Sequence, residues 1–214
     1  MTGTPARSPF RTAEERDAER AAKREAVLQA AVDMFNDRGF SGTSLDDVAA
    51  SLGVTKPVIY HYLGTKDQVL LECLGRGLAA LEAAAAESAG RPGTGADRLR
   101  AFLIRYAEVN MSPFGRSVVL TADHELSPDG LQRFRAMKRR IDAALRALVA
   151  AGIADGSLAP VDVRTAAFTL AGALNWIPRW QHPDGAQPPS KVAEEVVAML
   201  MHGLVGARNV VSPS

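Results

Sequence analysis

Residues 44–63 read SLDDVAASLGVTKPVIYHYL, and this stretch decides the fold because it holds two short helical patterns separated by a glycine. The first pattern presents apolar residues at helical spacing: Leu45, Val48 and Leu52. Gly53 ends that helix, and a second helix is expected over 56–63 with Pro57 in its first turn, where backbone amides lack helical partners. Two short helices joined by a tight turn that contains glycine predict a helix-turn-helix.

The segments on either side are also helical in pattern. Apolar residues at helical spacing predict a first helix over about 22–38, and Gly39 follows it as a left-handed cap. The segments 44–47 (SLDD) and 65–68 (TKDQ) each have the spacing of a capping box, which starts a helix. The second box opens a long helix that runs to about residue 88.

The remainder of the chain continues in the same way, so we predict an all-α fold. Residues 90–95, with Pro92 and several glycines, are expected to form a linker. Further helices are expected over about 96–110, 116–122, 127–151, 162–181 and 190–208. Residues 1–21 are polar and interrupted by prolines, and we expect them to form a disordered arm.

Composition indicates an ordinary globular protein. Charged residues make up 23% of the 214 residues, and the mean hydropathy is −0.04. No apolar run approaches the roughly 20 residues of a membrane span, and residues 1–23 lack the apolar core of a signal peptide. We therefore expect a cytoplasmic protein with no membrane partner. Cys73 is the single cysteine and is expected to lie in the core.

The sequence offers no motif of an enzyme, a metal site or a cofactor site. It contains no glycine loop of the phosphate-binding kind, no His-Glu-x-x-His pair and no motif that supports a nucleophile with a base. The four histidines are scattered along the chain. The cluster 123–125 (DHE) is interpreted as surface, because adjacent residues on a helix point apart. We predict that the protein is not an enzyme and uses no metal or cofactor.

The second short helix carries residue types that suit contact with nucleic acid. Its candidate exposed residues are Thr55, Lys56, Pro57, Val58, Tyr60 and His61. Hydroxyl, ammonium, phenol and imidazole groups donate to phosphates, and Pro57 and Val58 suit a thymine methyl or a groove wall. Charge gives no support, since residues 1–66 hold nine basic and nine acidic residues. Any DNA contact must therefore depend on where individual residues lie.

The segments around the two short helices resemble those of a known family. The segments GFSGTS (39–44), VA (48–49) and GVTKPVIYHYLGTKD (53–67) are similar to the tetracycline-repressor (TetR) family, over about 23–74. Pro57 and Leu63 depart from the residues usual there, Gly and Phe. The resemblance implies a DNA-binding regulator and the following DNA contacts: Thr43, Ser44, Thr55, Lys56, Tyr60, His61 and Lys66.

The resemblance divides the chain into three parts and implies a homodimer. The parts are the arm at 1–21, a helix-turn-helix DNA-binding domain at 22–66 and a ligand-binding and dimerisation domain at 67–214. The last two helices, rich in small and branched apolar residues, either fill the monomer core or pair with a second copy. A twofold operator needs two reading heads about 34 Å apart, which favours the dimer.

Residues 174–185 (LNWIPRWQHPDG) contain both tryptophans, with Pro178 interrupting the helix. They form either a helix end anchored by aromatics at the dimer interface, or part of a ligand site in which Arg179 holds an anionic group. The segment looks like the C-terminal part of TetR regulators that respond to acyl-CoA thioesters. The candidate ligand-binding residues are Phe102, Tyr106, Phe134, Met137, Phe168, Trp176, Arg179 and Trp180.

Two features of the second half of the chain can be interpreted in more than one way. The aromatic and methionine side chains among those candidates are also typical of plain core. A basic cluster on the seventh helix forms either a solvated face or a contact to a phosphorylated ligand: Arg133, Arg135, Lys138, Arg139 and Arg140.

The sequence thus predicts a ligand-responsive transcriptional regulator, most simply a repressor, whose partners are an operator DNA, a second copy and a small apolar or acyl-CoA effector. The alternatives are a regulator that responds to a drug or secondary metabolite, or an activator.

Overall fold

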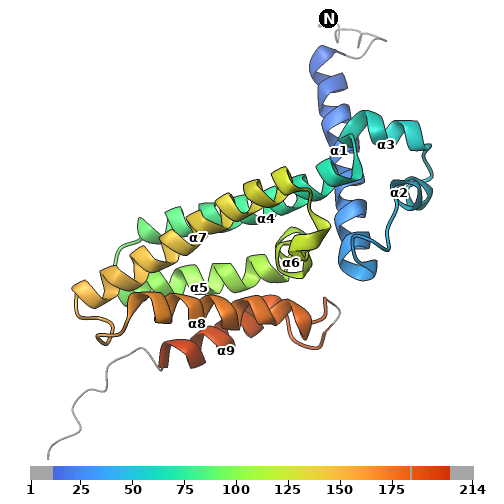
Figure 1. Cartoon of the computed structure of the whole chain (residues 1–214). Helices are drawn as coiled ribbons and strands as arrows, with labels where there is room; N and C mark the ends of the chain where they lie inside the picture. Colours follow the sequence, from blue (N-terminus) through green and yellow to red (C-terminus); the bar gives the residue numbers. More distant parts are fainter. Residues whose placement is uncertain (1–11, 184, 203–214) are drawn as a thin grey trace, which may run out of the picture.

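The computed structural model describes residues 12–183 and 185–202, and within these ranges the chain is helical without strands, which confirms the predicted all-α fold (Figure 1). The α-helices are α1 (Ala13–Arg38), α2 (Leu45–Ser51), α3 (Lys56–Leu63), α4 (Lys66–Ala89), α5 (Gly95–Met111), α6 (Pro113–Leu120), α7 (Pro128–Ala154), α8 (Val163–Trp176) and α9 (Pro189–His202). Two short 3₁₀ helices are η1 (Asp123–Glu125) and η2 (Ile177–Arg179).

Helix α1 begins at Ala13, so the prediction of a disordered arm over 1–21 is wrong for its last nine residues. Thr12 caps the helix: its hydroxyl accepts from the Glu15 amide at 3.1 Å, and the Glu15 carboxylate accepts from the Thr12 amide at 2.9 Å. The first turns are rich in Ala, Glu and Arg, which form helices readily without a buried face. The rest of the predicted arm, 1–11, lies outside the described residues.

A small apolar core holds α1, α2 and α3 together at one end of the molecule (Figure 1). Val32, Val48 and Ile59, one from each helix, have no exposed surface. Gly53 makes the turn between α2 and α3 with a φ of +64°, a conformation that favours glycine. The predicted helix-turn-helix is present.

Helix α4 leaves this unit and becomes the centre of the second half, where it packs against α5, α6 and α7. Its buried face includes Leu70, Leu74 and Leu78. Cys73 on the same face is fully buried, as predicted, and burial raises the pKa of its thiol to about 12. In the N-terminal part of α4, Glu72 accepts a hydrogen bond from Arg24 of α1 at 2.6 Å. One continuous helix therefore joins the two parts of the chain.

Helices α5, α8 and α9 form a layer that lies below α4 and α7 in the view of Figure 1. The helix expected over 162–181 is divided, because α8 ends at Trp176 and η2 follows with Pro178 inside it. Helix α9 is described to His202, and the remainder of the helix expected to residue 208 lies outside the described residues. Within those residues, no helix is both long and apolar enough to span a bilayer.

Gly77 permits an unusually close approach of α4 and α6. A Cβ at this position would lie 2.5 Å from the backbone oxygen of Phe114 and 2.7 Å from Cγ2 of Val118. These distances are below van der Waals contact, so even alanine would push the two helices apart. The absence of a side chain at Gly77 thus sets the α4–α6 spacing.

Gly77→Ala is expected to lower the free energy of unfolding by about 1–3 kcal/mol, the usual cost of overpacking a core. Gly75→Ala is the matched control, because a Cβ at Gly75 meets nothing within 4 Å. Alanine is the better helix former, so this control should raise stability by about 0.5–1 kcal/mol. Urea unfolding followed by circular dichroism measures both, and equal effects would contradict the close-approach argument.

Candidate nucleic-acid interface and internal cavity

The outward side of α3 carries most of the residues predicted to contact DNA. Ile59 and Leu63 are buried and hold α3 against its neighbours, which leaves the opposite side of the helix facing solvent. Several predicted contact residues are exposed: Thr55, Lys56, Pro57, Tyr60 and His61. Val58 is partly buried beside them. Helix α3 therefore offers a hydroxyl, an ammonium, a phenol and an imidazole on an accessible surface.

Lys56 is held in place by its neighbours on this surface. Its Nζ donates to Oδ2 of Asp46 on α2 at 2.8 Å and lies 5.8 Å from the centre of the Tyr60 ring. The hydrogen bond to Asp46 raises the pKa of Lys56, so the ammonium stays charged at neutral pH. Thr55 precedes it as the N-cap, but its side chain makes no capping hydrogen bond. The Thr55 hydroxyl is therefore not committed to the helix.

Thr43 does not share this surface, so the prediction that it contacts DNA is corrected. Thr43 is only 2% exposed, and its hydroxyl donates to the carbonyls of Met34 at 3.1 Å and Gly39 at 3.0 Å. These hydrogen bonds fasten the end of α1 to the start of α2. Thr43 positions α2 instead of facing a ligand.

Ser44 and Lys66, the other two predicted contacts, lie at helix N-termini. Ser44 caps α2 by accepting from the Asp47 amide at 3.1 Å, and its hydroxyl also donates to the Asp47 carboxylate at 2.6 Å, a bond that lowers the pKa of Asp47. Lys66, the first residue of α4, places its Nζ 4.0 Å from the centre of the Phe40 ring. Lys66 is thus pre-positioned by a cation–π contact, whereas Ser44 lies beside an anionic carboxylate.

A cavity of about 700 Å³ opens between α4, α5, α6, α7, α8 and η2. Four of the eight candidate ligand residues line it: Tyr106, Phe168, Trp176 and Arg179. Phe168 and Trp176 are 54% and 61% exposed, so they form its rim, while Tyr106 is buried. The apolar wall is completed by Leu78, Leu81, Val118, Ile141, Leu145 and Ala171. The cavity thus combines an apolar wall with an aromatic rim.

The other four candidates are not part of this wall, so their assignment to the ligand site is corrected. Phe102 and Phe134 are fully buried core residues, with 0% and 1% exposure. Met137 is partly buried and packs against the same core. Trp180 follows η2 and is 48% exposed. Helical spacing reveals which residues are apolar, but not whether they face a filled core or a hollow.

Cationic side chains gather around the cavity. Lys138 and Arg139, from the basic cluster of α7, line it together with Arg179, whose guanidinium lies 5.4 Å from the centre of the Trp176 ring. Asp142 is the acidic residue in the lining. Arg135 of the same cluster instead pairs with Asp123 at 2.6 Å. The basic cluster therefore divides between the cavity and the outer surface.

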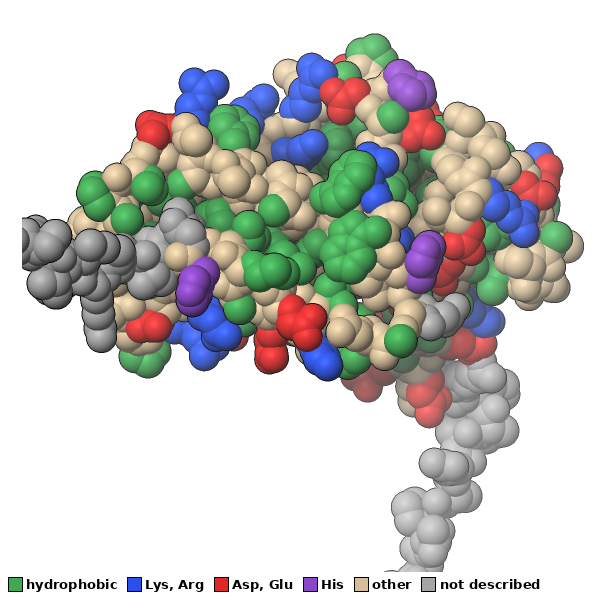
Figure 2. Space-filling view, turned by 90° about the horizontal axis from the view of Figure 1, so that it is seen from below, with side chains coloured by type: hydrophobic (Ala, Val, Ile, Leu, Met, Phe, Trp, Pro, Cys, Tyr) green, Lys and Arg blue, Asp and Glu red, His purple; other side chains and the backbone are tan. Residues whose placement is uncertain are grey.

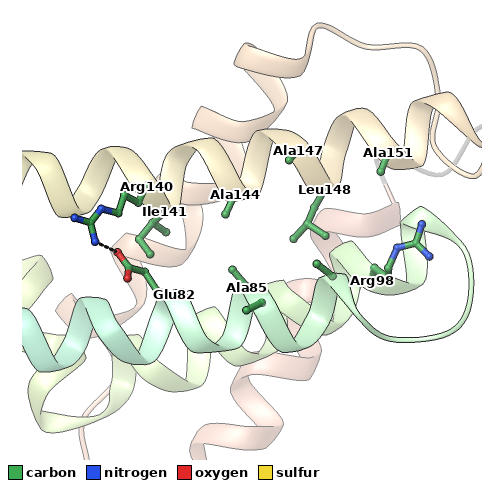
Figure 3. Close-up of a pocket in the computed structure, with 11 residues that line it drawn as sticks. Glu82, Ala85, Arg98, Arg140, Ile141, Ala144, Ala147, Leu148 and Ala151 are labelled. Atoms are coloured by element: carbon green, nitrogen blue, oxygen red, sulfur yellow. Dashed lines mark hydrogen bonds and ion pairs between the residues drawn. The ribbon is translucent and has the colours of Figure 1, made fainter.

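A smaller hollow of about 550 Å³ lies between α4 and α7 and is lined mainly by alanines (Figure 3). At one end of it, Arg140 of α7 reaches across to Glu82 of α4 at 3.5 Å. None of the candidate ligand residues lines this hollow. Arg140 thus serves the contact between the two helices and not the larger cavity.

A network of neutral polar side chains, which the sequence analysis did not identify, crosses the wall of the larger cavity. Tyr106 donates from its hydroxyl to Oδ1 of Asn175 at 3.2 Å. Asn110 donates from Nδ2 to the same oxygen at 3.1 Å and to the backbone oxygen of Leu174 at 3.2 Å. Burial raises the pKa of Tyr106 to about 12, so its hydroxyl stays protonated. An asparagine at an apolar helical position was the available signal.

Helices α8 and α9 expose large apolar side chains. Figure 2, which views the molecule from below Figure 1, shows hydrophobic side chains gathered on this face. Phe168, Trp176 and Trp180 come from α8 and the segment after it, and Met199 of α9 is 69% exposed. An apolar surface of this kind is typical of a protein–protein interface.

The fold and the α3 surface define a class of protein, the helix-turn-helix regulators with a helical second domain. A family model described as "Bacterial regulatory proteins, tetR family" matches residues 27–73, and one described as "Tetracyclin repressor-like, C-terminal domain" matches residues 92–204. The chain belongs to the TetR family of bacterial transcriptional regulators. Its relatives are transcription regulators and not enzymes.

Individual relatives cover almost the whole chain. The transcriptional repressor KstR2 of Mycolicibacterium smegmatis is 26% identical over 197 residues, which is 86% of this chain and 91% of that protein. The structure of the TetR regulator PfmR from Thermus thermophilus has a TM-score of 0.75 at 28% identity and covers 86% of this chain and 99% of PfmR. AibR, solved with isovaleryl coenzyme A and operator DNA, has a TM-score of 0.72 at 25% identity, covering 83% and 97%.

The Lys56–Asp46 pair predicts opposite effects of two substitutions on DNA binding. Lys56→Met should weaken binding to DNA that flanks the protein's own coding sequence and make the salt slope shallower by about one, because a phosphate contact is lost. Asp46→Asn should strengthen binding at low salt, because it removes a repelling carboxylate and releases Lys56. Fluorescence anisotropy over a salt series measures both.

Glu87→Gln is the matched control for the change of charge. Glu87 lies near the far end of α4 and pairs with Arg91 at 4.0 Å, so this variant also loses an acidic member of an exposed ion pair. It should bind DNA as the parent protein does. An Asp46→Asn variant that behaves like Glu87→Gln would show that Asp46 does not restrain DNA binding through Lys56.

Proposed function

We propose that this protein is a transcriptional repressor that binds a palindromic operator as a homodimer and is released by an acyl-CoA thioester. The observation that carries the proposal is the combination, in one chain, of an accessible α3 and a cavity with an apolar wall and cationic surroundings. We place its action in the cytoplasm, where bacterial DNA lies.

In the proposed complex, α3 enters the major groove and the flanking helices contact the DNA backbone. Pro57, Val58 and Tyr60 meet base edges or the groove wall. The polar and charged contacts position the helix on phosphates: Ser44, Thr55, Lys56, His61 and Lys66. Local placement compensates for the zero net charge of 1–66, since Lys56 and Lys66 are each held by a neighbouring side chain, Asp46 and Phe40 respectively.

A homodimer is supported by the exposed apolar face of α8 and α9. Phe168, Trp176 and Met199 on this face would leave water when a second copy covers them. A twofold pair of α3 helices about 34 Å apart then matches successive turns of the same DNA face.

An acyl-CoA effector is supported by the division of the cavity into apolar and cationic parts. The apolar wall suits an acyl group, whereas Lys138, Arg139 and Arg179 suit the phosphates of coenzyme A. The likeness to AibR, which was solved with isovaleryl coenzyme A, and to the repressor KstR2 supports the same class.

Helix α6 provides the route from the cavity to the DNA-binding domain. Arg116 of α6 is buried and donates to the backbone oxygens of Pro178 at 2.6 Å and Gln181 at 2.8 Å, next to Arg179 of the cavity. At the start of α6, the carbonyl of Pro113 accepts from Asn36 of α1 at 2.8 Å. A ligand that moves η2 therefore also moves α6 and, through it, α1.

The effector binds more tightly to a dimer whose two DNA-binding domains are separated by a distance that does not fit the operator. A shift from mostly bound to mostly released needs about a 10⁴-fold preference, or about 5.5 kcal/mol. Two cavities in a dimer share this requirement.

Decanoyl-CoA is expected to release the protein from DNA, and Arg179→Met should weaken this release about tenfold or more, because a charge-assisted contact to phosphate is lost. Arg133→Met, at an exposed arginine of α7 outside the cavity lining, should respond as the parent protein does. Anisotropy titrations measure release, and light scattering tests for two chains per operator. DNA binding that is indifferent to a panel of CoA esters would refute this effector class.

Arg116→Met is expected to uncouple the cavity from DNA. The variant should still bind both partners, but decanoyl-CoA should lower its DNA affinity about fivefold less than in the parent protein, the size typical of a residue within a coupling network. Arg116→Lys keeps the positive charge with a single donor nitrogen, so its ester-induced loss of DNA affinity should lie between those of the parent protein and Arg116→Met. The measurement is the ratio of DNA affinities with and without saturating ester, and an unchanged ratio would remove α6 from the route.

A further inference from the structure

The side-chain amide of Asn175 on α8 has a free donor in the lining of the larger cavity. Its Oδ1 accepts hydrogen bonds from the Tyr106 hydroxyl at 3.2 Å and from Nδ2 of Asn110 at 3.1 Å. Its Nδ2 has no hydrogen-bond partner among the described residues. In the same part of the chain, the unpaired polar atoms that are buried are Oδ1 of Asn36 and Oδ1 of Asn110, so Nδ2 of Asn175 retains accessible surface.

A backbone carbonyl determines which end of the Asn175 amide is free. Asn110 donates from Nδ2 to the backbone oxygen of Leu174 at 3.2 Å. A carbonyl only accepts, so the end of Asn110 that meets both Leu174 and Asn175 is its nitrogen. Asn175 must then offer its oxygen to Asn110. Turning the Asn175 amide over would break this hydrogen bond, so Nδ2 is fixed as the free end.

Along α8 and η2, Asn175 lies between an apolar and a cationic residue of the cavity lining. Ala171 precedes it by about one helical turn and Arg179 follows it by about one turn, and both line the same cavity. Gly172 lines it too, and a Cβ there would meet nothing within 4 Å, so space is open on this side of α8. Because Oδ1 of Asn175 is turned to Tyr106 and to α5, Nδ2 is the end of the amide that remains for the cavity.

We propose that Nδ2 of Asn175 donates a hydrogen bond to the thioester carbonyl of the effector. This inference rests on the proposed acyl-CoA effector and names the residue that recognises its ester group. An acyl-CoA presents an alkyl chain, then the carbonyl, then the phosphates, which is the order of Ala171, Asn175 and Arg179 in the lining. A neutral amide suits the neutral carbonyl, whereas the guanidinium suits phosphate.

This hydrogen bond gives the cavity a means to distinguish an ester from an analogue without the carbonyl. A methylene group in place of the carbonyl would cover Nδ2 of Asn175 and leave the donor unpaired. A site that bonds a polar group discriminates against analogues that lack this group, because its own polar atom loses its partner. We expect the thioester to bind about tenfold more tightly than the corresponding thioether.

The experiment compares decanoyl-CoA with S-decyl-CoA, a thioether that keeps the phosphates and the other carbonyls of coenzyme A, by isothermal titration of the full chain without DNA. The parent protein should prefer the ester about tenfold. Asn175→Asp keeps an acceptor for Tyr106 and Asn110 but has no donor at about pH 8, where aspartate is ionised, and should lose this preference.

Thr121→Asp is the matched control for the added charge. Thr121 also lines the cavity but has no part in the amide network, so this variant places the same carboxylate in the lining and keeps Asn175. It should lower the affinities for both ligands by the same factor and retain the preference for the ester. Loss of the preference in both variants would assign the effect to charge and overturn the role of Asn175.

The outcomes separate this inference from the proposed function. Equal binding of the ester and the thioether by the parent protein would overturn the role of Asn175 and leave the acyl-CoA proposal intact. No binding of either ligand would overturn both. A preference that persists in Asn175→Asp would assign the carbonyl to another donor. If circular dichroism shows that this variant does not fold, Asn175→Leu, which also lacks the donor but adds no charge, takes its place with the same expected result.

Discussion

The close contact between α4 and α6 is the constraint on which the rest of the molecule depends. Gly77 lets the backbone of α6 approach α4 until only a hydrogen fits between them. Through this contact α6 lies between the DNA-binding domain and the cavity, with Pro113 accepting from α1 and Arg116 donating to the segment after α8. Because packed helices at this spacing resist small deformations, we expect a movement at one side to be passed to the other instead of being absorbed.

The sequence predicted the elements well where local chemistry determines them. The capping boxes at 44–47 and 65–68 placed two helix starts at the observed residues, and Gly53 adopts the left-handed conformation that its turn requires. The start of α1 was missed because the pattern of buried residues begins only at Val27, whereas the preceding turns are held by a cap and by intrinsic helix preference. Hydrophobic periodicity detects buried faces and is blind to a solvent-exposed helix.

The cavity was predicted only in part, since its wall depends on how distant helices pack. Tyr106 and Phe102 lie one helical turn apart on α5, yet one faces the cavity and the other is enclosed by core. The sequence contains nothing that distinguishes them. Asn110 and Asn175 were missed for the opposite reason, because an asparagine gains its meaning from the partner across the interface, 65 residues away in the chain. Thr43 was misassigned similarly, as its hydroxyl proved to be used inside the fold.

The zero net charge of residues 1–66 also has a local explanation. Asp46 and Asp47 stabilise the N-terminus of α2, where negative charge is favourable, but in the proposed complex both approach the DNA phosphates. The ion pair of Asp46 with Lys56 at 2.8 Å reconciles these demands: it neutralises one carboxylate and holds the ammonium beside Tyr60. In the proposed complex, DNA competes with Asp46 for Lys56, so a wrong sequence that offers only phosphates would gain little from this lysine. Affinity is thereby shifted from charge toward the fit of α3 in the groove, which is the term that distinguishes one operator from another.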